Sequence, residues 1–383
     1  MNEYLDNARR NIQRAMNQSY NSLTEVANMA RTLASSTGSQ LYSTLMNLKA
    51  LVLQEAMESA GLRGSIESNS SIRSSSRSAT SSNEYAIDST HFQSTAQSTS
   101  TSQSTSASAS LASCQPRLVS VVCGFPKDIE MYPNYNKGQF GEDAWFRTST
   151  SKAEALGVAD GVGGWRVYGI DPGQFSRFLM RSCERLTHTH DFEATRPEQL
   201  LARAYCNLLE QKKPILGSCT ACVLTLLRGS NTLYAANIGD SGLLVIRDGS
   251  IVCRSMEQQH HFNTPFQLAV PPPGHELNVL TDGPECAALL QFDIQCGDIL
   301  VLATDGVYDN VSEEMLVRVL SHAAGISDPV KLQTYANSVA LMARSLSFNP
   351  SHDSPFSRNA RRHNIDAPGG KPDDITVILA SVV

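Results

Sequence analysis

The chain has 383 residues, of which 41% are hydrophobic and 18% are charged, and its formal net charge at pH 7 is −6. This length suffices for one large domain with additional segments, or for two domains. The negative charge argues against a nucleic-acid-binding protein, and no apolar run approaches the roughly 18 residues of a transmembrane helix. The nine cysteines are scattered and odd in number, which is typical of reduced intracellular thiols.

Residues 1–63 carry apolar side chains at spacings of three and four, which predicts an amphipathic helical segment. We expect its apolar stripe to bind a partner protein, a membrane surface or a second helix of the same segment. Arg9 and Arg14 also suit a mitochondrial presequence, whereas Glu3 and Asp6 argue against one, because transit peptides avoid acidic residues. A cytoplasmic location therefore stays open beside a mitochondrial one.

Residues 64–113 are dominated by serine and threonine, as in "STSTSQSTSASAS". Such a composition cannot form a hydrophobic core, so we predict a disordered linker. A folded domain is then expected over residues 114–383.

In the predicted domain, short apolar runs alternate with turns and a few helical stretches. This pattern indicates an α+β fold in which antiparallel sheets carry helices on their outer faces. "RDGS", residues 247–250, is a hairpin signal between two of the runs. The expected strands are 117–123, 144–149, 154–160, 220–227, 232–238, 242–247, 298–304 and 374–380, and the expected helices are 173–188, 197–210, 312–323 and 328–346.

Two of the apolar runs end in an Asp-Gly pair. "GVADGVGGW" brings Asp160 and Gly161 to the end of one expected strand, and "DILVLATDGVYDN" brings Asp305 to the end of another. A single Asp-Gly pair after a strand is usually only a turn. Two such pairs suggest that the fold carries two carboxylates to one place.

Further acidic residues stand at other strand ends. Two carboxylates about 4 Å apart repel each other by roughly 4 kcal/mol at an effective dielectric of 20, so a cluster of them requires cations. Oxygen ligands without His or Cys select hard ions such as Mg²⁺ or Mn²⁺. A pair of such ions activates water and neutralises phosphate, so this pattern predicts phosphate-ester hydrolysis. The additional acidic residues are Glu142, Asp143, Asp240, Asp373 and Asp374.

Five segments in order along the chain resemble the motifs of the metal-dependent type 2C Ser/Thr protein phosphatases, the PPM family. They are "FGEDAWF", "GVADGVGGW", "NIGDSG", "LATDGVYDN" and "KPDDITVIL". The segments "DPGQFSRFLM" and "QHHFNTPFQL" are similar to the mitochondrial PTC-seven branch of that family. The resemblance covers residues 116–383 and implies a four-layer α-β-β-α sandwich of two antiparallel sheets.

The resemblance also implies roles for the acidic residues. Asp160, Asp305 and Asp373 would be catalytic as ligands of two Mn²⁺ or Mg²⁺ ions, with Asp160 bridging them. The carbonyl of Gly161 and the side chain of Glu142 would help to hold one ion. Asp143 and Asp240 would lie nearby, on metal-bound waters or a weaker third ion. The implied reaction is the hydrolysis of phosphoserine and phosphothreonine on protein substrates by a water activated between the ions.

The sequence departs from the family pattern at two positions. Many members carry an arginine that grips the substrate phosphate where this chain has Gly138, so we expect the adjacent Lys137 to take that role as a point charge. Many members also carry a histidine, proposed as general acid, where this chain has Val162. Two other functions stay open: a phosphohydrolase acting on small molecules, and a catalytically weak scaffold protein.

Overall fold

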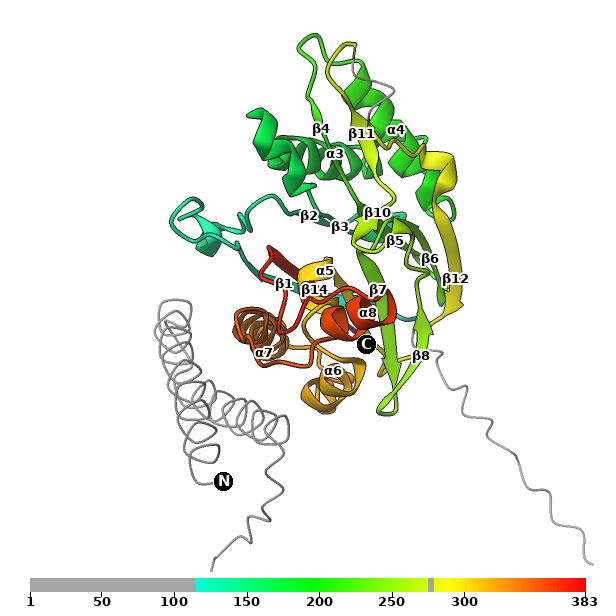
Figure 1. The fold of residues 1–383 in the computed structure, drawn as a ribbon. Coiled ribbons are helices and arrows are strands. Elements are labelled where there is room, and N and C mark those ends of the chain that lie inside the picture. The colour runs from blue at the N-terminus through cyan, green and yellow to red at the C-terminus, as the bar shows by residue number, and fades with distance from the viewer. Residues whose placement is uncertain (1–114, 275–278) are drawn as a thin grey trace, which may run out of the picture. The chain divides into compact units, whose positions relative to one another are not determined.

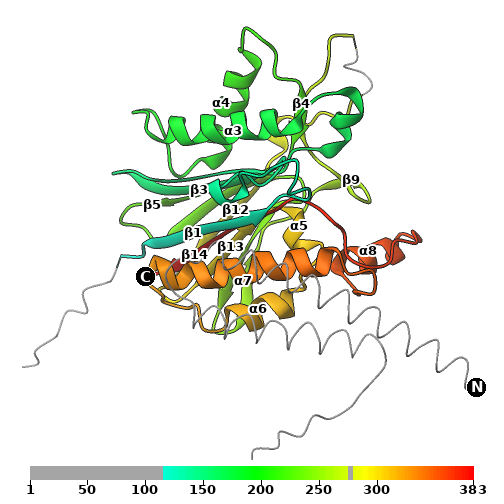
Figure 2. The same cartoon turned by 90° about the vertical axis from the view of Figure 1, so that its left-hand side faces the viewer.

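The computed structural model describes residues 115–274 and 279–383. The predictions for residues 1–63 and 64–113 lie outside the described residues. In the described part, two five-stranded antiparallel sheets stack face to face, and helices cover the outer face of each sheet (Figure 1, Figure 2). The predicted α+β class and the four-layer α-β-β-α sandwich are therefore confirmed.

The first sheet contains both ends of the folded domain. Its strands follow the order β1-β14-β13-β7-β8, and every neighbouring pair is antiparallel. Its outer face packs against helices α6 (Glu313–Leu320) and α7 (Pro329–Ser347). The strands are β1 (Leu118–Phe125), β14 (Ile375–Val382), β13 (Ile299–Ala303), β7 (Gly242–Arg247) and β8 (Ser250–Arg254).

The second sheet follows the order β12-β6-β5-β3-β2, again with antiparallel neighbours. Helices α3 (Pro172–Thr187) and α4 (Pro197–Leu209) cover its outer face. The strands are β12 (Ala288–Asp293), β6 (Thr232–Ile238), β5 (Ala221–Leu227), β3 (Ala153–Ala159) and β2 (Ala144–Ser149).

The remaining elements are short. Strand β4 (Gly217–Cys219) pairs with β11 (Leu268–Val270), and β9 (Gln259–His261) pairs with β10 (Thr264–Pro265). All the predicted strands and helices form, with ends shifted by at most three residues. The other short elements are the helices α5 (Asp305–Tyr308) and α8 (Pro355–Arg362) and the 3₁₀ turns η1 (Tyr135–Lys137), η2 (Gly163–Tyr168) and η4 (Pro284–Cys286). The sequence analysis predicted neither β12 nor any of the short elements named in this paragraph.

The central strands are apolar throughout because both of their faces are buried. In β13, Val301 faces the helices of the first sheet, whereas Leu300 and Leu302 face the core between the two sheets. In β3, Val158 lies in the same inner core while Ala155 packs toward the helices of the second sheet. Strands buried on both faces read as continuous apolar runs rather than alternating ones.

Local signals set the hairpin and the helix starts. The turn between β7 and β8 places Asp248 at φ 49° and Gly249 at φ 73°, which is the left-handed pair that an Asp-Gly hairpin favours. Helix α7 begins after Asp328, whose side chain accepts a hydrogen bond from the Val330 N–H at 2.9 Å. No helix in the described part of the chain is long and apolar enough to cross a membrane.

Candidate metal centre and active site

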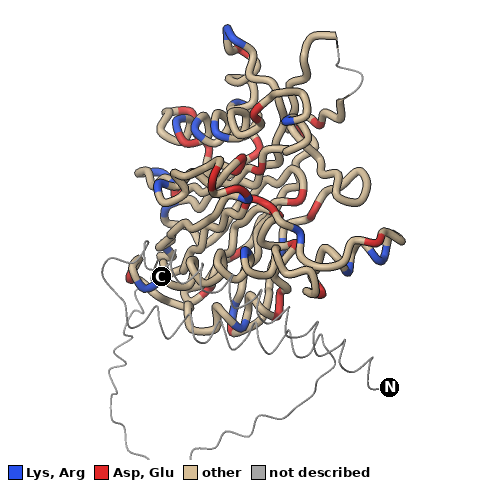
Figure 3. Tube along the Cα trace, turned by 60° about the vertical axis from the view of Figure 1, so that its left-hand side comes forward, with Lys and Arg blue, Asp and Glu red and all other residues tan. Residues whose placement is uncertain are grey.

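Six acidic residues named by the sequence analysis lie beside strand ends at one edge of the sandwich. Antiparallel pairing sets the start of β2 beside the end of β3, and the end of β13 beside the start of β14. The turn between β6 and β7 crosses from one sheet to the other, and acidic positions gather where the sheets meet (Figure 3). Glu142 and Asp143 precede β2, Asp160 follows β3, Asp240 lies between β6 and β7, Asp305 begins α5 after β13, and Asp373 precedes β14.

Asp160 lies at the electrostatic centre of this cluster. Burial raises the pKa of its carboxyl well above the usual range, and the neighbouring negative charges raise it further. The charge of Asp305 contributes most among these neighbours. The predicted ligands therefore share one environment, in which like charges oppose ionisation. The neighbours that raise the pKa of Asp160 are Asp305, Asp143, Asp373 and Asp240.

The backbone around Asp160 is held from the neighbouring strand region. The Thr220 N–H donates to the Asp160 carbonyl at 2.9 Å, and the Asp160 N–H donates to Thr220 Oγ1 at 3.3 Å. A Cβ added to Gly161 would lie 2.8 Å from the carbonyl oxygen of Glu142. Glycine thus allows the segment after Asp160 to run close against the segment that carries Glu142.

Two buried carboxylate oxygens of the cluster have no hydrogen-bond partner in the part of the chain that the structure describes. Asp143 is 3% exposed, and its Oδ2 accepts from Thr304 Oγ1 at 2.8 Å, while its Oδ1 has none. Asp305 shows the same pattern, with an unpartnered, buried Oδ1. Burial, followed by the charge of Asp374, raises the pKa of Asp143 well above its usual range. Buried polar atoms are normally satisfied, so these two oxygens suit the coordination of a cation.

Asp374 has a structural role beside the cluster. Its Oδ1 accepts from the Lys127 N–H at 2.5 Å, and its Oδ2 accepts from the Glu142 N–H at 2.7 Å. Burial raises its pKa to about 6, although these two hydrogen bonds oppose the rise. Asp374 thereby ties the start of β14 to the chain that carries Glu142.

Lys371, which the sequence analysis did not single out, enters the cluster from the segment before β14. Its ammonium pairs with Asp305, Asp309 and Asp373. Burial alone would raise the pKa of Asp305, but the charge and hydrogen bond of Lys371 prevail and lower it. Burial and the charge of Asp305 raise the pKa of Asp373 to about 6 despite Lys371. Only the tertiary fold reveals this contact, because Lys371 and Asp305 are 66 residues apart.

Arg166 is a second cation that the sequence analysis missed. It lies in η2, just after Gly161, where its Nε–H donates to Glu142 Oε1 and its side chain also donates to the Tyr132 hydroxyl. Lys137, the predicted phosphate contact, is exposed at the end of η1, and within the described residues its side chain makes no hydrogen bond or ion pair. The available signal for Arg166 was its position in "DGVGGWR", five residues after Gly161.

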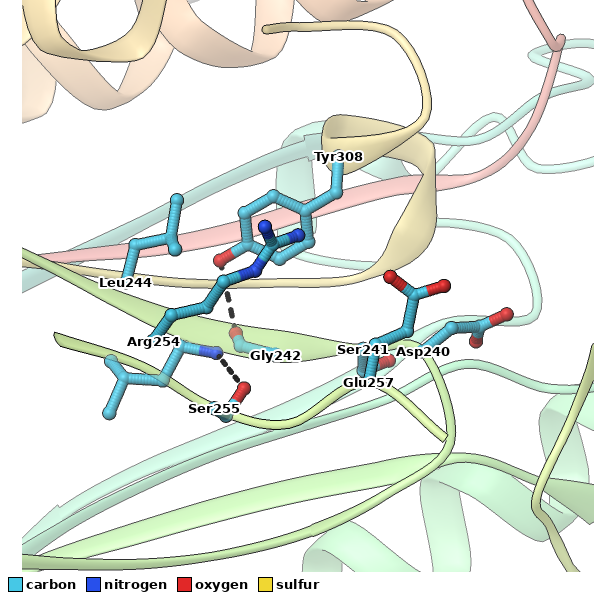
Figure 4. A pocket seen from close by; sticks show the side chains of 9 residues that line it. Asp240, Ser241, Gly242, Leu244, Arg254, Ser255, Glu257 and Tyr308 are labelled. Carbon is cyan, nitrogen blue, oxygen red and sulfur yellow. Dashed lines mark hydrogen bonds between the residues drawn. The ribbon is translucent and has the colours of Figure 1, made fainter. Parts of the chain in front are cut away.

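A small pocket adjoins the cluster at Asp240. Figure 4 shows Asp240 and Glu257 at one end and Arg254 near Tyr308 at the other. The Tyr308 hydroxyl donates to the carbonyl oxygens of Gly242 and Val301, which fixes the ring. Arg254 already pairs with a carboxylate of α6 at 2.6 Å, so this pocket adds no unpaired cation for a phosphate.

The donor set suits hard divalent ions. Carboxylate oxygens dominate the cluster, and two of them are buried without a partner. As they stand, no three His, Cys, Asp or Glu side chains within residues 115–274 and 279–383 form a set that could hold an ion. Fewer than three carboxylates, together with water and backbone carbonyl oxygens, would hold an ion in this arrangement. Their chemistry still matches Mg²⁺ or Mn²⁺ better than soft metals.

Comparison with known proteins identifies the family. Residues 134–265 match the family described as protein phosphatase 2C. A human Protein phosphatase PTC7 homolog is 47% identical over 265 residues, which cover 69% of this chain and 87% of the relative. The Xenopus laevis homolog of the same name is 47% identical over 266 residues, covering 69% and 89%. The structure titled "X-ray structure of the photosystem II phosphatase PBCP" is 29% identical with a TM-score of 0.57, covering 69% and 98%.

The acidic edge of the sandwich and this match define a metal-dependent phosphatase of the 2C class. The chain belongs to the protein phosphatase 2C, or PPM, family, and its relatives assign it to the PTC7 branch. It is accordingly a protein serine/threonine phosphatase that depends on divalent metal ions, and phosphorylated proteins are its substrates. Nothing in the comparisons favours a small-molecule phosphohydrolase or a weak scaffold protein.

Proposed function

We propose that Asp160, Asp305 and Asp373 are the catalytic metal ligands of this phosphatase, with Asp160 between two ions. The proposal rests mainly on the unpartnered, buried Oδ1 of Asp305, which faces no donor within a cluster of like charges. Bound Mn²⁺ or Mg²⁺ would supply the positive charge that neutralises a phosphate ester and promotes loss of a proton from water.

The other predicted residues have supporting roles in this proposal. The Gly161 carbonyl and Glu142 help to hold one ion, because both lie on segments that pack closely together. Asp143 and Asp240 would bind metal-coordinated water or a weaker third ion. The unpartnered Oδ1 of Asp143 supports its assignment. Asp240 Oδ2, by contrast, accepts a hydrogen bond from Gln259 Nε2 at 3.3 Å.

Two residues are candidates for contact with the substrate phosphate. Lys137 is the sequence prediction, and its exposed position leaves its ammonium without a partner among the described residues. Arg166 has the stronger geometric support, because it already contacts Glu142 at the cluster and its guanidinium carries five donors in a planar fork. We propose Arg166 as the principal phosphate contact.

A metal-dependence assay tests the proposed site. Full-length protein freed of metal with a chelator should hydrolyse neither an aryl phosphate nor a phosphothreonine peptide, and added Mn²⁺ should restore both activities. A metal-restored activity on the aryl phosphate alone would contradict the assignment of protein substrates. Equal activity with and without the chelator would contradict the metal centre.

We propose a mitochondrial location and the domain division into residues 1–63, 64–113 and 114–383. The basic residues of the N-terminal segment and the similarity to the PTC7 branch support that location. A fluorescent protein fused to residues 1–60 tests it: accumulation outside mitochondria would favour the cytoplasmic alternative. The same fusion would report whether this segment binds a membrane surface.

A further inference from the structure

The candidate metal centre already contains a positive charge that belongs to the chain. Lys371 Nζ lies 2.5 Å from Asp305 Oδ2, 2.7 Å from Asp309 Oδ2 and 3.4 Å from Asp373 Oδ2. Only 16% of the Lys371 side chain is exposed. One ammonium group thus pairs with three carboxylates, two of which are predicted metal ligands.

The fold holds Lys371 at this position through its backbone. The Lys371 N–H donates to Asn310 Oδ1 at 2.8 Å, and Asn310 Nδ2 donates to the Lys371 carbonyl at 2.9 Å. Asn310 is fully buried, and its Nδ2 also donates to the Gly306 carbonyl in the turn of Asp305. The ring of Phe356 in α8 lies 5.5 Å from Nζ. Lys371 and Asp305 are therefore fastened to each other through Asn310.

Lys371 contacts only some of the oxygens of the carboxylates around it. Lys371 donates to Oδ2 of Asp305, and the buried Oδ1 of the same carboxylate has no hydrogen bond from residues 115–274 or 279–383. For Asp373, Oδ2 faces Lys371 while Oδ1 accepts from the Asp374 N–H at 3.0 Å. An ammonium group of charge +1 cannot neutralise three carboxylates, so the cluster keeps a net negative charge. A divalent ion would neutralise this charge.

We propose that Lys371 is a built-in counter-cation of the metal centre. It holds Asp305, Asp309 and Asp373 together when no metal ion is bound, and its charge weakens the binding of an ion to the Asp305–Asp373 side. This inference rests on the proposed metal centre. It adds a residue of this chain that sets the stability of the metal-free protein and the metal affinity.

The substitution Lys371→Met tests both effects, because it keeps the length of the side chain and removes its charge. In metal-free full-length protein, the buried carboxylate of Asp305 and the partly exposed carboxylates of Asp309 and Asp373 would lose their shared partner, so the unfolding midpoint should fall by roughly 5 °C or more. Mn²⁺, titrated calorimetrically, should bind to the variant about tenfold more tightly, because a unit charge a few ångströms from the ion is removed.

Three further variants serve as controls. Lys371→Arg keeps the charge and should remain closer to the wild type in both measurements. Lys331→Met removes a charge from an exposed position on α7 and should change neither. If Lys371→Met fails to fold, Lys371→Met combined with Asp309→Asn removes a carboxylate together with the cation, and it should be more stable than Lys371→Met alone.

Several results would overturn the inference. One is an unfolding midpoint of the metal-free Lys371→Met variant that equals that of the wild type. Another is an affinity of this variant for Mn²⁺ that is equal to or lower than that of the wild type. The third is a double variant with Asp309→Asn that is no more stable than Lys371→Met alone. If the wild-type protein itself binds no Mn²⁺, the proposed metal centre fails together with this inference. If the wild type binds Mn²⁺ and the variant behaves like it, only the role of Lys371 fails.

Discussion

Replacement of Arg166 by alanine should weaken the binding of the substrate phosphate far more than replacement of Lys137. Arg166 lies against Glu142 at the edge of the carboxylate cluster, and its side chain is 38% exposed, so it can reach both the site and a substrate. Lys137 is exposed at the end of η1, and its side chain makes no hydrogen bond or ion pair with any residue that the structure describes. The positions of the two side chains therefore favour Arg166 over Lys137 as the residue that binds the substrate phosphate.

The magnitude follows from the type of contact. A hydrogen bond to a charged group contributes about 1.5–3 kcal/mol, which corresponds to a roughly 10- to 150-fold change in affinity. Arg166→Ala should raise KM for a phosphothreonine peptide, and the inhibition constant of inorganic phosphate, by a factor in that range. The value of kcat should change less, because the ground state and the transition state both carry the phosphate charge.

The assay compares full-length wild type, Arg166→Ala, Arg166→Lys and Lys137→Ala at saturating Mn²⁺. Arg166→Lys should recover part of the phosphate affinity, since lysine keeps the charge but loses the planar fork. Arg166→Ala also leaves the buried carboxylate of Glu142 without its partner. Tyr132→Phe, which removes the hydroxyl contact of Arg166, therefore reports structural disturbance without loss of charge. An unchanged phosphate inhibition constant in Arg166→Ala, with a clear loss in Lys137→Ala, would refute the assignment.

Three further predictions concern the metal centre and the domain. Asp160→Asn should abolish activity by several orders of magnitude, since it removes the central charge of the cluster, and a residual rate above about a tenth of wild type would contradict the two-ion site. Deletion of residues 1–112 should leave a soluble domain active on an aryl phosphate; inclusion bodies from this truncation alone would refute the domain boundary. Metal-free protein should lose stability as the pH rises from about 4 to about 7. Burial raises the pKa of Asp373 to about 6 and that of Asp309 to about 7. Over this pH range the folded state therefore binds more protons than the unfolded chain, and a rise in pH favours unfolding. Thermal melts with a chelator and with Mn²⁺ test this: the loss should shrink when the ion is present, and an equal loss under both conditions would count against it.

Much of the fold was predictable because its signals are local. The continuous apolar runs of β3 and β13 indicated strands buried on both faces, and the Asp-Gly pair at residues 248–249 indicated the β7–β8 hairpin. Strand β12 was missed. Its residues alternate between partly buried and exposed, as at the edge of a sheet, and Leu289 is 64% exposed.

The candidate site was predictable in its acidic residues and not in its cations. Asp160, Asp305 and their partners follow strand ends or precede strand starts, and such positions can be recognised from apolar runs and the turn residues beside them. The contacts of Lys371 with Asp305 and of Arg166 with Glu142 join residues 66 and 24 positions apart. Contacts between residues so far apart in the chain leave no local sequence pattern from which they could be predicted.

The sequence by itself determined which residues form strands and which carboxylates stand at their ends, because hydrophobic period and turn chemistry act within a few residues. Only the tertiary structure decided how the charges of that edge are balanced. The stacking of the two sheets brings the segment before β14 against the turn after β13, and this places the ammonium of Lys371 among Asp305, Asp309 and Asp373. Charge balance depends on distances between segments remote in the chain, and those distances exist only once the sheets have packed.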